Sequence, residues 1–325
     1  MDRDDWLAQV TEDAIEPGLE ICDPHHHLWD RPGTTYMLDE LLADTGSGHT
    51  VVSTVFVECM SGYRTDGPEE MRPVGETEFV EAVAVDEPMR ACAGIVSFAD
   101  LTLGSKVGDV LDAHAAASPR FRGIRHASGW DASDEVRNSH TNPPRGLLGD
   151  DAFRAGFAEL GSRGLSFDAW FYHPQLSELV DLARAFPETT IVLDHFGGPL
   201  GIGPYEGKRG DIFAAWKPVL SELAACPNVV AKLGGLVMPI NGFGFHTRER
   251  PAMSDELVEA TRDWYLHAID CFSPDRCMFE SNFPVDRASC SYTVLWNSFK
   301  KIAASFDVRE KAAMFHDTAT RVYRL

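Results

Sequence analysis

Short apolar runs rich in β-branched residues alternate with amphipathic segments along the whole chain. We predict that eight of these runs are strands, at residues 21–23, 51–57, 93–96, 121–126, 165–172, 190–195, 229–233 and 277–281. Apolar residues fill almost every position of these runs, which is typical of strands that are covered on both faces. The pattern therefore favours a parallel sheet enclosed by helices.

Amphipathic segments with helical spacing separate the predicted strands. We expect helices at residues 74–85, 106–117, 151–163, 175–185, 212–225, 255–272, 292–305 and 308–323. This alternation predicts an α/β fold of the (β/α)8 TIM-barrel type. A doubly wound open sheet is the main alternative, but no GxGxxG sequence follows an early strand. Since no linker interrupts the pattern, residues 1–325 are predicted to form a single domain.

The loops of this pattern are unequal in length. Long polar or Gly/Pro-rich segments follow the second, fourth, sixth and seventh strands, at residues 59–73, 127–149, 196–209 and 235–254. Loops that lead into strands are shorter. Excess loop length therefore gathers on the C-terminal face of the barrel, where enzymes of this architecture keep their active sites. The pattern favours an enzyme.

Charge and composition restrict the partners. The net charge of −21 would repel nucleic acid and anionic membranes at long range, yet it permits a local cationic pocket for an anionic small molecule. The first residues resemble no secretory signal, and no apolar run is long enough to span a membrane. The seven cysteines form no CxxC pair. We expect a cytoplasmic protein with reduced thiols, and a homo-oligomer stays open.

Candidate chemistry begins at the end of the first predicted strand, in the sequence Asp23-Pro24-His25-His26-His27. Because side chains alternate along a strand, His25 and His27 should point to one side and His26 to the other. Two convergent imidazoles suit a divalent metal or an anionic transition state. A tag remnant is disfavoured, since apolar residues continue the run.

Polar side chains also stand at the ends of four other predicted strands. They are Arg125-His126 on the fourth, His173 on the fifth, Asp194-His195 on the sixth and Glu280-Ser281-Asn282 on the eighth. The C-terminal ends of barrel strands converge, so we expect these groups in one cavity.

Arginine at the fourth strand indicates how a substrate could be held. Arg122 and Arg125 have opposite parity, and Arg125 is nearer the strand end, so we expect Arg125 to face the mouth. There it could clamp a substrate carboxylate with two parallel hydrogen bonds. His126, Glu58 and Tyr63 are further candidates for substrate binding. The substrate is therefore predicted to be a small anion.

The opening run Asp23-Pro24-His25-His26-His27-Leu28-Trp29 resembles the Asp-x-His-x-His start of the amidohydrolase superfamily, in its amidohydrolase-related branch. Segments 121–126, 192–199, 278–286 and 315–319 resemble the same branch in the same order. The resemblance implies a distorted (β/α)8 barrel and hydrolytic or related chemistry. Its nearest characterised members are lactonases of pyrone dicarboxylates and sugar acids.

The resemblance also implies roles for single residues. His25 and His27 match the family's first-strand pair, His173 its fifth-strand position and His195 its sixth-strand histidine. Together His25, His27 and His173 would hold one divalent metal, with zinc as the first choice. Some members of the branch work without a metal, so a metal-free mechanism stays open.

The eighth strand departs from the family pattern, because Asn282 stands where the family has an aspartate. An amide cannot act as a general base and is a weak metal ligand. Asp286 and Glu280 are the acids of this segment that could compensate. Glu280 shares the parity of Asn282 and should lie deeper in the barrel, where Lys232 or the first-strand histidines could be its partner.

The sequence thus predicts a hydrolase, and by resemblance a lactonase that opens a small carboxylated lactone by water attack. His195 or Asp286 would be the base, while Asn282 would bind water or substrate. One alternative is a metal-dependent decarboxylase or hydratase of a small unsaturated or aromatic acid, which needs no attacking water. Another is a binding protein without turnover.

Overall fold

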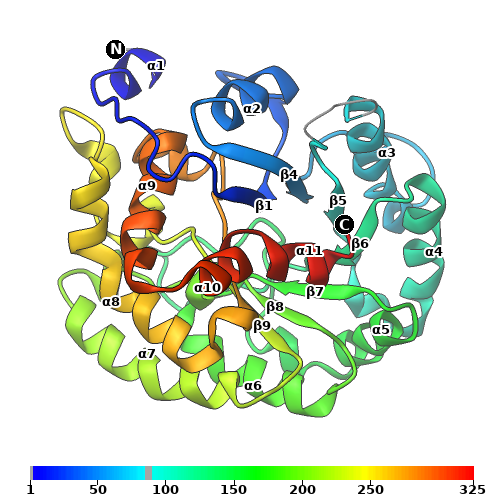
Figure 1. Ribbon diagram of the computed structural model, residues 1–325. Helices are drawn as coiled ribbons and strands as arrows, with labels where there is room; N and C mark the ends of the chain where they lie inside the picture. Colours follow the sequence, from blue (N-terminus) through cyan, green and yellow to red (C-terminus); the bar gives the residue numbers. More distant parts are fainter. Residues whose placement is uncertain (1–2, 85–89) are drawn as a thin grey trace.

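A barrel of parallel strands forms the centre of the protein (Figure 1). The computed structural model describes residues 3–84 and 90–325. Its eight-stranded sheet follows chain order: β1 (Glu20–His26), β4 (Thr50–Val57), β5 (Gly94–Ser97), β6 (Phe121–Ile124), β7 (Ser166–Ala169), β8 (Ile191–Leu193), β9 (Val229–Leu233) and β10 (Cys277–Phe279). The two ends of the sheet meet where the backbone N–H of His27 donates to the carbonyl of Phe283, at 2.8 Å. The predicted barrel is confirmed.

Helices surround the barrel as an outer ring (Figure 1). They are α3 (Val74–Val83), α4 (Val107–Ala117), α5 (Asp151–Ser162), α6 (Leu176–Ala185), α7 (Arg209–Ala224), α8 (Ser254–Phe272) and α9 (Tyr292–Ile302). The predicted helix 74–85 ends earlier, and its last residue, Val85, lies outside the described residues. The predicted helix 308–323 is divided into α10 (Val308–Ala312), a π-helical turn and α11 (Thr318–Tyr323).

Four short elements near the N-terminus were not predicted from the sequence pattern. They are α1 (Arg3–Leu7), the hairpin of β2 (Trp29–Arg31) and β3 (Thr34–Tyr36), and α2 (Leu38–Thr45). Strands of three residues are too short to show an alternation of polar and apolar positions. The hairpin follows His27 directly, so it brings Trp29 and Arg31 to the end of the first barrel strand.

The C-terminal helix closes one end of the barrel, as the red segment in Figure 1 shows. Ala319 and Tyr323 pack against an apolar layer inside the barrel that includes Val55, Val96 and Met278. The side chain of Arg324 donates to the carbonyl of Gly164, just before β7 begins. This helix therefore covers the N-terminal ends of the strands and leaves the other end to the long loops.

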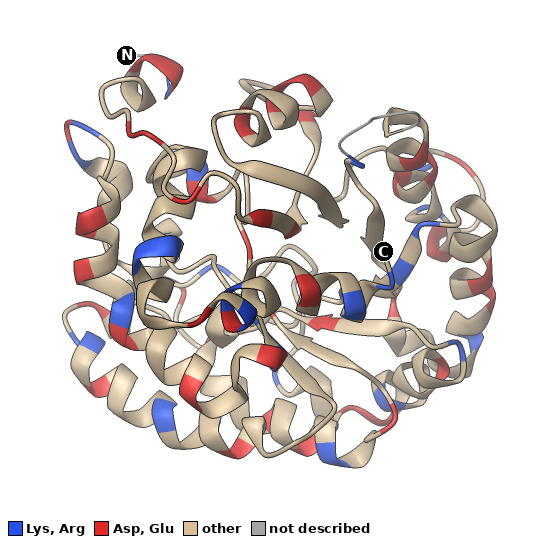
Figure 2. Cartoon of the chain, in the orientation of Figure 1, with Lys and Arg blue, Asp and Glu red and all other residues tan. Residues whose placement is uncertain are grey.

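Acidic residues are spread over the outer helices, among fewer basic ones (Figure 2). This excess of acidic over basic residues accounts for the net charge of −21. Within residues 3–84 and 90–325, no helix has both the length and the apolar character needed to cross a membrane.

Candidate active site

A pocket of about 470 Å³ opens at the C-terminal ends of the strands. It is lined by His27, Trp29, Arg31, Cys59, Met60, Arg125, Arg137, His140, Trp170, His195, Met238, Asn282 and Val285. A larger cavity of about 550 Å³ lies between the loops that follow β8 and β9, but none of the predicted site residues lines it. The first pocket is therefore the candidate active site.

The wall of this pocket is cationic. Its lining holds three arginines and three histidines, and no carboxylate residue among the described residues. Arg31 lies over the ring of Trp29, with 4.5 Å between the guanidinium carbon and the ring centroid. In a protein of net charge −21, such a wall is a local reversal of sign that attracts anions.

Beneath the pocket, one carboxylate joins two imidazoles. Glu280 places Oε1 at 2.6 Å from Nδ1 of His195 and Oε2 at 2.8 Å from Nδ1 of His25. All three side chains are buried. Glu280 therefore points into the barrel, and the first-strand histidine is its partner rather than Lys232.

Lys232, on β9, pairs with two other carboxylates. Its Nζ lies 2.7 Å from Oδ2 of Asp168 and 3.2 Å from Oδ1 of Asp194. Burial lowers the pKa of Lys232, but Asp168, Asp194 and Glu280 raise it more, so the net shift is upward and the amine stays charged. Asp168 also accepts a hydrogen bond from the hydroxyl of Tyr323, which ties this layer to α11.

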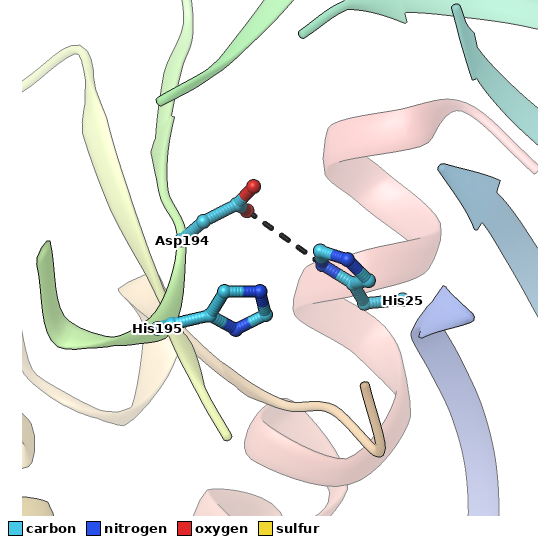
Figure 3. A group of neighbouring side chains, drawn as sticks. All are labelled: His25, Asp194 and His195. Atoms are coloured by element: carbon cyan, nitrogen blue, oxygen red, sulfur yellow. Dashed lines mark ion pairs between the residues drawn. The ribbon is translucent and has the colours of Figure 1, made fainter. Parts of the chain in front are cut away.

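The ligand atoms of His25, Asp194 and His195 lie within 4.8 Å of one another, a spacing that fits one divalent cation (Figure 3). Oδ1 of Asp194 pairs with Lys232, whereas Oδ2 accepts no hydrogen bond from any described residue and is the oxygen available to a cation. Two imidazoles and one carboxylate suit zinc. His27 and His173, predicted to be ligands, do not belong to this group.

His25 itself is buried and neutral. Burial, followed by the charge of Lys232, brings the pKa of His25 well below its usual value. One ring nitrogen, Nε2, lies 3.3 Å from Nη1 of Arg125, so it accepts from a permanent donor. Nδ1 lies 2.8 Å from Oε2 of Glu280 and 3.2 Å from Nζ of Lys232.

His27 stands at the mouth of the pocket, above His25, with 5.0 Å between the ring centroids. Its Nδ1 lies 2.8 Å from the carbonyl oxygen of Val57, a geometry in which the ring N–H donates. The pKa of His27 is well below its usual value because of burial and the charge of Arg125. His27 therefore presents an unprotonated Nε2 in the pocket.

Three pocket residues adopt left-handed backbone conformations, Met60 with φ 65°, His195 with φ 51° and Asn282 with φ 55°. Such conformations cost energy in residues other than glycine and gather at functional sites. Gly235, after β9, lies so close that a Cβ atom there would meet Nδ1 of His195 at 2.2 Å. The glycine is required by the position of the imidazole.

Arg125 faces the pocket, as its parity predicts, but its guanidinium fork is already engaged. Nε lies 2.7 Å from Oε1 of Glu58, and Nη2 donates to the carbonyl oxygen of Glu58 at 2.6 Å. Burial raises the pKa of Glu58, yet the charges of Arg125 and His140 lower it more, to about 2. The prediction that Arg125 clamps a substrate carboxylate with two parallel bonds is therefore corrected: it clamps Glu58.

The structure does not bring His173, His126 and Tyr63 to the pocket wall. β7 ends at Ala169, so His173 lies beyond the strand, where it accepts from the N–H of Leu200. His126 has the opposite parity to Arg125 and is buried outside the barrel against Phe153. Tyr63 is half-buried in the loop after β4.

Asp286 is buried behind Asn282 rather than exposed in the mouth. Its Oδ1 accepts from the side-chain amide of Asn282 at 3.3 Å. Burial, then the charge of Glu280, raises the pKa of Asp286 well above its ordinary value. A base needs contact with the attacking water, and Asn282, not Asp286, lines the pocket.

Sequence reasoning did not assign Arg31, Arg137, His140 and Trp170 to the site, nor Asp194 to the ligand group. Asp194 could have been found, because it follows β8 directly and precedes His195. The loop residues carry no spacing signal, since only the folded loop determines which side chains turn inward.

Comparison with known proteins agrees with this geometry. Residues 22–325 match the family model described as Amidohydrolase. The chain is 33% identical to the uncharacterized protein y4mH of Sinorhizobium fredii over 94% of this chain and 99% of that protein. It is 30% identical to L-fucono-1,5-lactonase of Burkholderia multivorans, which covers 77% of each chain.

A solved structure supports the same relationship. The crystal structure of an amidohydrolase from Burkholderia multivorans with bound zinc has a TM-score of 0.72 and 25% identity, covering 94% of this chain and 99% of that one. Since the family model spans nearly the whole barrel and its strand-end histidines, this chain belongs to the amidohydrolase family and is a hydrolase.

Proposed function

We propose that the protein is a lactonase that opens a small carboxylated lactone by the attack of water. One observation carries the proposal: the pocket wall holds three arginines and three histidines and, among the described residues, no carboxylate. Such a wall favours an anionic substrate. The lactonase name of the Burkholderia multivorans relative supports the reaction class.

Binding of the substrate carboxylate is assigned to Arg31 and Arg137. Both guanidinium groups line the pocket and are exposed, whereas Arg125 is engaged by Glu58. Arg137 has no charged partner within the described part of the chain, so it is available for a charge-assisted hydrogen bond. Trp170 supplies an apolar surface for the ring.

His195 is assigned the role of contacting the attacking water. With Nδ1 hydrogen-bonded to Glu280, the other ring nitrogen, Nε2, is the atom available to the pocket. That atom either takes a proton from water or binds a cation together with His25 and Asp194. When bound there, a divalent cation supplies positive charge that polarises a carbonyl oxygen. Asn282 donates or accepts a hydrogen bond to water or substrate.

Proton release from purified protein tests the proposal. The substrates are a carboxylated lactone, its methyl ester and a neutral lactone of equal ring size. We expect turnover of the carboxylated lactone, with kcat/KM about 10–100-fold above that of the ester, the usual effect of one charge-assisted pair. Absence of ring opening on all three substrates would exclude a lactonase.

Asn282 supports a second candidate function, that of a lyase. A decarboxylase or hydratase requires no carboxylate base for water, so the amide at the end of the eighth strand suits a lyase. CO2 release from small unsaturated or aromatic acids, measured with the same preparation, separates the two reactions.

A further inference from the structure

A second histidine–carboxylate pair lies at the pocket, on elements different from those of the first. Nε2 of His140 lies 3.1 Å from Oε2 of Glu58. Glu58 is fully buried, and its pKa of about 2 keeps it ionised at every pH at which the protein would work. His140 therefore donates its Nε2–H to a fixed negative charge, which leaves Nδ1 as the ring atom that can exchange a proton with the pocket.

The loop that carries His140 is held firmly in place. The hydroxyl of Thr141 donates to the carbonyl of Ala127 at 2.5 Å, and the N–H of Ser139 donates to the carbonyl of Gly129 at 2.9 Å. The hydroxyl of Tyr172 donates to the carbonyl of Arg137 at 2.5 Å. These three bonds tie the loop to its own base and to the end of the β7 segment, so His140 has a defined position.

The three pocket histidines differ in what their rings can do. His27 donates Nδ1–H to the carbonyl oxygen of Val57, so its ring is held by the backbone. His195 is buried and joined to Glu280. His140 has 27% of its side chain exposed, and its Nδ1 has no partner among the described residues. Only a ring that contacts both the pocket and solvent can deliver a proton to a substrate and regain it directly.

From this division of roles we infer that His140 is the general acid of the reaction and that Glu58 is its positioning residue. The inference rests on the proposed lactonase function. A water oxygen forms a bond to the lactone carbonyl carbon, and one water proton passes to the base. The bond between that carbon and the ring oxygen then breaks, its electron pair goes to the ring oxygen, and Nδ1–H of His140 protonates it. The products are a hydroxyl group and a carboxylic acid, and His140 regains a proton from solvent.

Dependence on the leaving group tests this role. The substrates are a carboxylated aliphatic lactone, whose alkoxide leaves poorly, and a carboxylated enol lactone, whose enolate leaves readily. In His140→Gln, we expect kcat on the aliphatic lactone to fall about 10²–10³-fold and kcat on the enol lactone to change only severalfold, with KM nearly constant. A good leaving group needs no proton, so the loss must be selective.

The matched control is His316→Gln. His316 also pairs with a neighbouring carboxylate, at 2.8 Å from Asp317, and has similar exposure, but it lies in the C-terminal π-helical turn away from the pocket. Its kinetics should equal those of the natural protein on both lactones. Glu58→Gln, which keeps the shape and removes the charge, should show the same selective loss as His140→Gln.

Each outcome bears on one assignment. An equal loss on both lactones, or no loss in His140→Gln, overturns the general-acid role while leaving the lactonase function intact. Failure of the natural protein to open either lactone overturns the proposed function, and the role of His140 with it.

Discussion

Oε1 of Glu280 lies 2.6 Å from Nδ1 of His195, although β9 stands between the strands that carry them. The two residues are 85 positions apart in sequence. This contact fixes the orientation of the imidazole and determines which ring nitrogen faces the pocket. It is the structural reason to place His195 at the centre of the chemistry.

Glu280→Gln should reduce turnover strongly. The amide keeps the shape but removes the charge that fixes the tautomer of His195, so we expect kcat to fall about 10²–10⁴-fold with little change in KM. Steady-state kinetics on the best lactone measure the effect, and circular dichroism checks the fold. Full activity in the folded variant would refute the role of Glu280.

Arg137→Met should weaken binding of the acid form of the substrate. The loss of one charge-assisted hydrogen bond should raise KM roughly 10–100-fold, while kinetics on the methyl ester stay nearly constant. Arg122→Met is the control, because Arg122 lies outside the pocket and donates to the backbone carbonyl of Pro119. Equal effects of Arg137→Met on acid and ester would remove Arg137 from substrate recognition.

The metal content of the protein should depend on Asp194. If His25, Asp194 and His195 hold one cation, elemental analysis of the protein dialysed against zinc should find roughly one zinc per chain, and Asp194→Asn should lose most of it. Asp286→Asn is the comparison, since Asp286 lies behind Asn282 and outside the ligand group. Equal zinc content in all three proteins would place the metal elsewhere.

Asn282→Asp should strengthen metal binding by adding a carboxylate at the pocket. The new acid would also face Asp286, whose pKa burial and Glu280 already raise, so one proton should be shared between the two. Zinc affinity should therefore rise with pH more steeply than in the natural protein. A titration of zinc binding at several pH values measures this, and an unchanged affinity at every pH contradicts the expectation.

Glu76→Gln should stabilise the protein at alkaline pH. Burial, then the charge of Glu58, raises the pKa of Glu76 from its usual value to about 8. The unfolded chain ionises Glu76 at its normal pKa, so the folded form holds the extra proton and loses stability as pH rises toward 8. Each pKa unit corresponds to about 1.4 kcal/mol. Because the substituted amide is neutral at every pH, the variant should avoid this loss.

Thermal unfolding at pH 5 and pH 8 measures the effect of Glu76→Gln. The gain in Tm over the natural protein should be larger at pH 8 than at pH 5. The hydrogen bonds from the N–H groups of Cys59 and Ser61 to Oε1 of Glu76 can persist to an amide oxygen. A gain that is independent of pH would show that Glu76 is not the titrating group.

The barrel could be predicted from the sequence because the burial of each element determines the order of polar and apolar residues within it. Strands covered on both faces are continuously apolar and helices of the outer ring are amphipathic, so the residue pattern alone gives all eight strands. The parity of the fourth strand likewise placed Arg125 inward, whereas His126, predicted to bind substrate, has the opposite parity and packs against Phe153 outside the barrel. These features depend only on neighbours along the chain.

The contents of the site depended on contacts across the barrel. The end of β7 at Ala169 left His173 out of the group, and the fork of Arg125 turned to Glu58 because a buried arginine needs a carboxylate partner. His140 reached the pocket through the folding of a long loop. Contacts between residues far apart in sequence, and the requirement that buried charges be paired, decided these positions. A local pattern of residues contains neither kind of information.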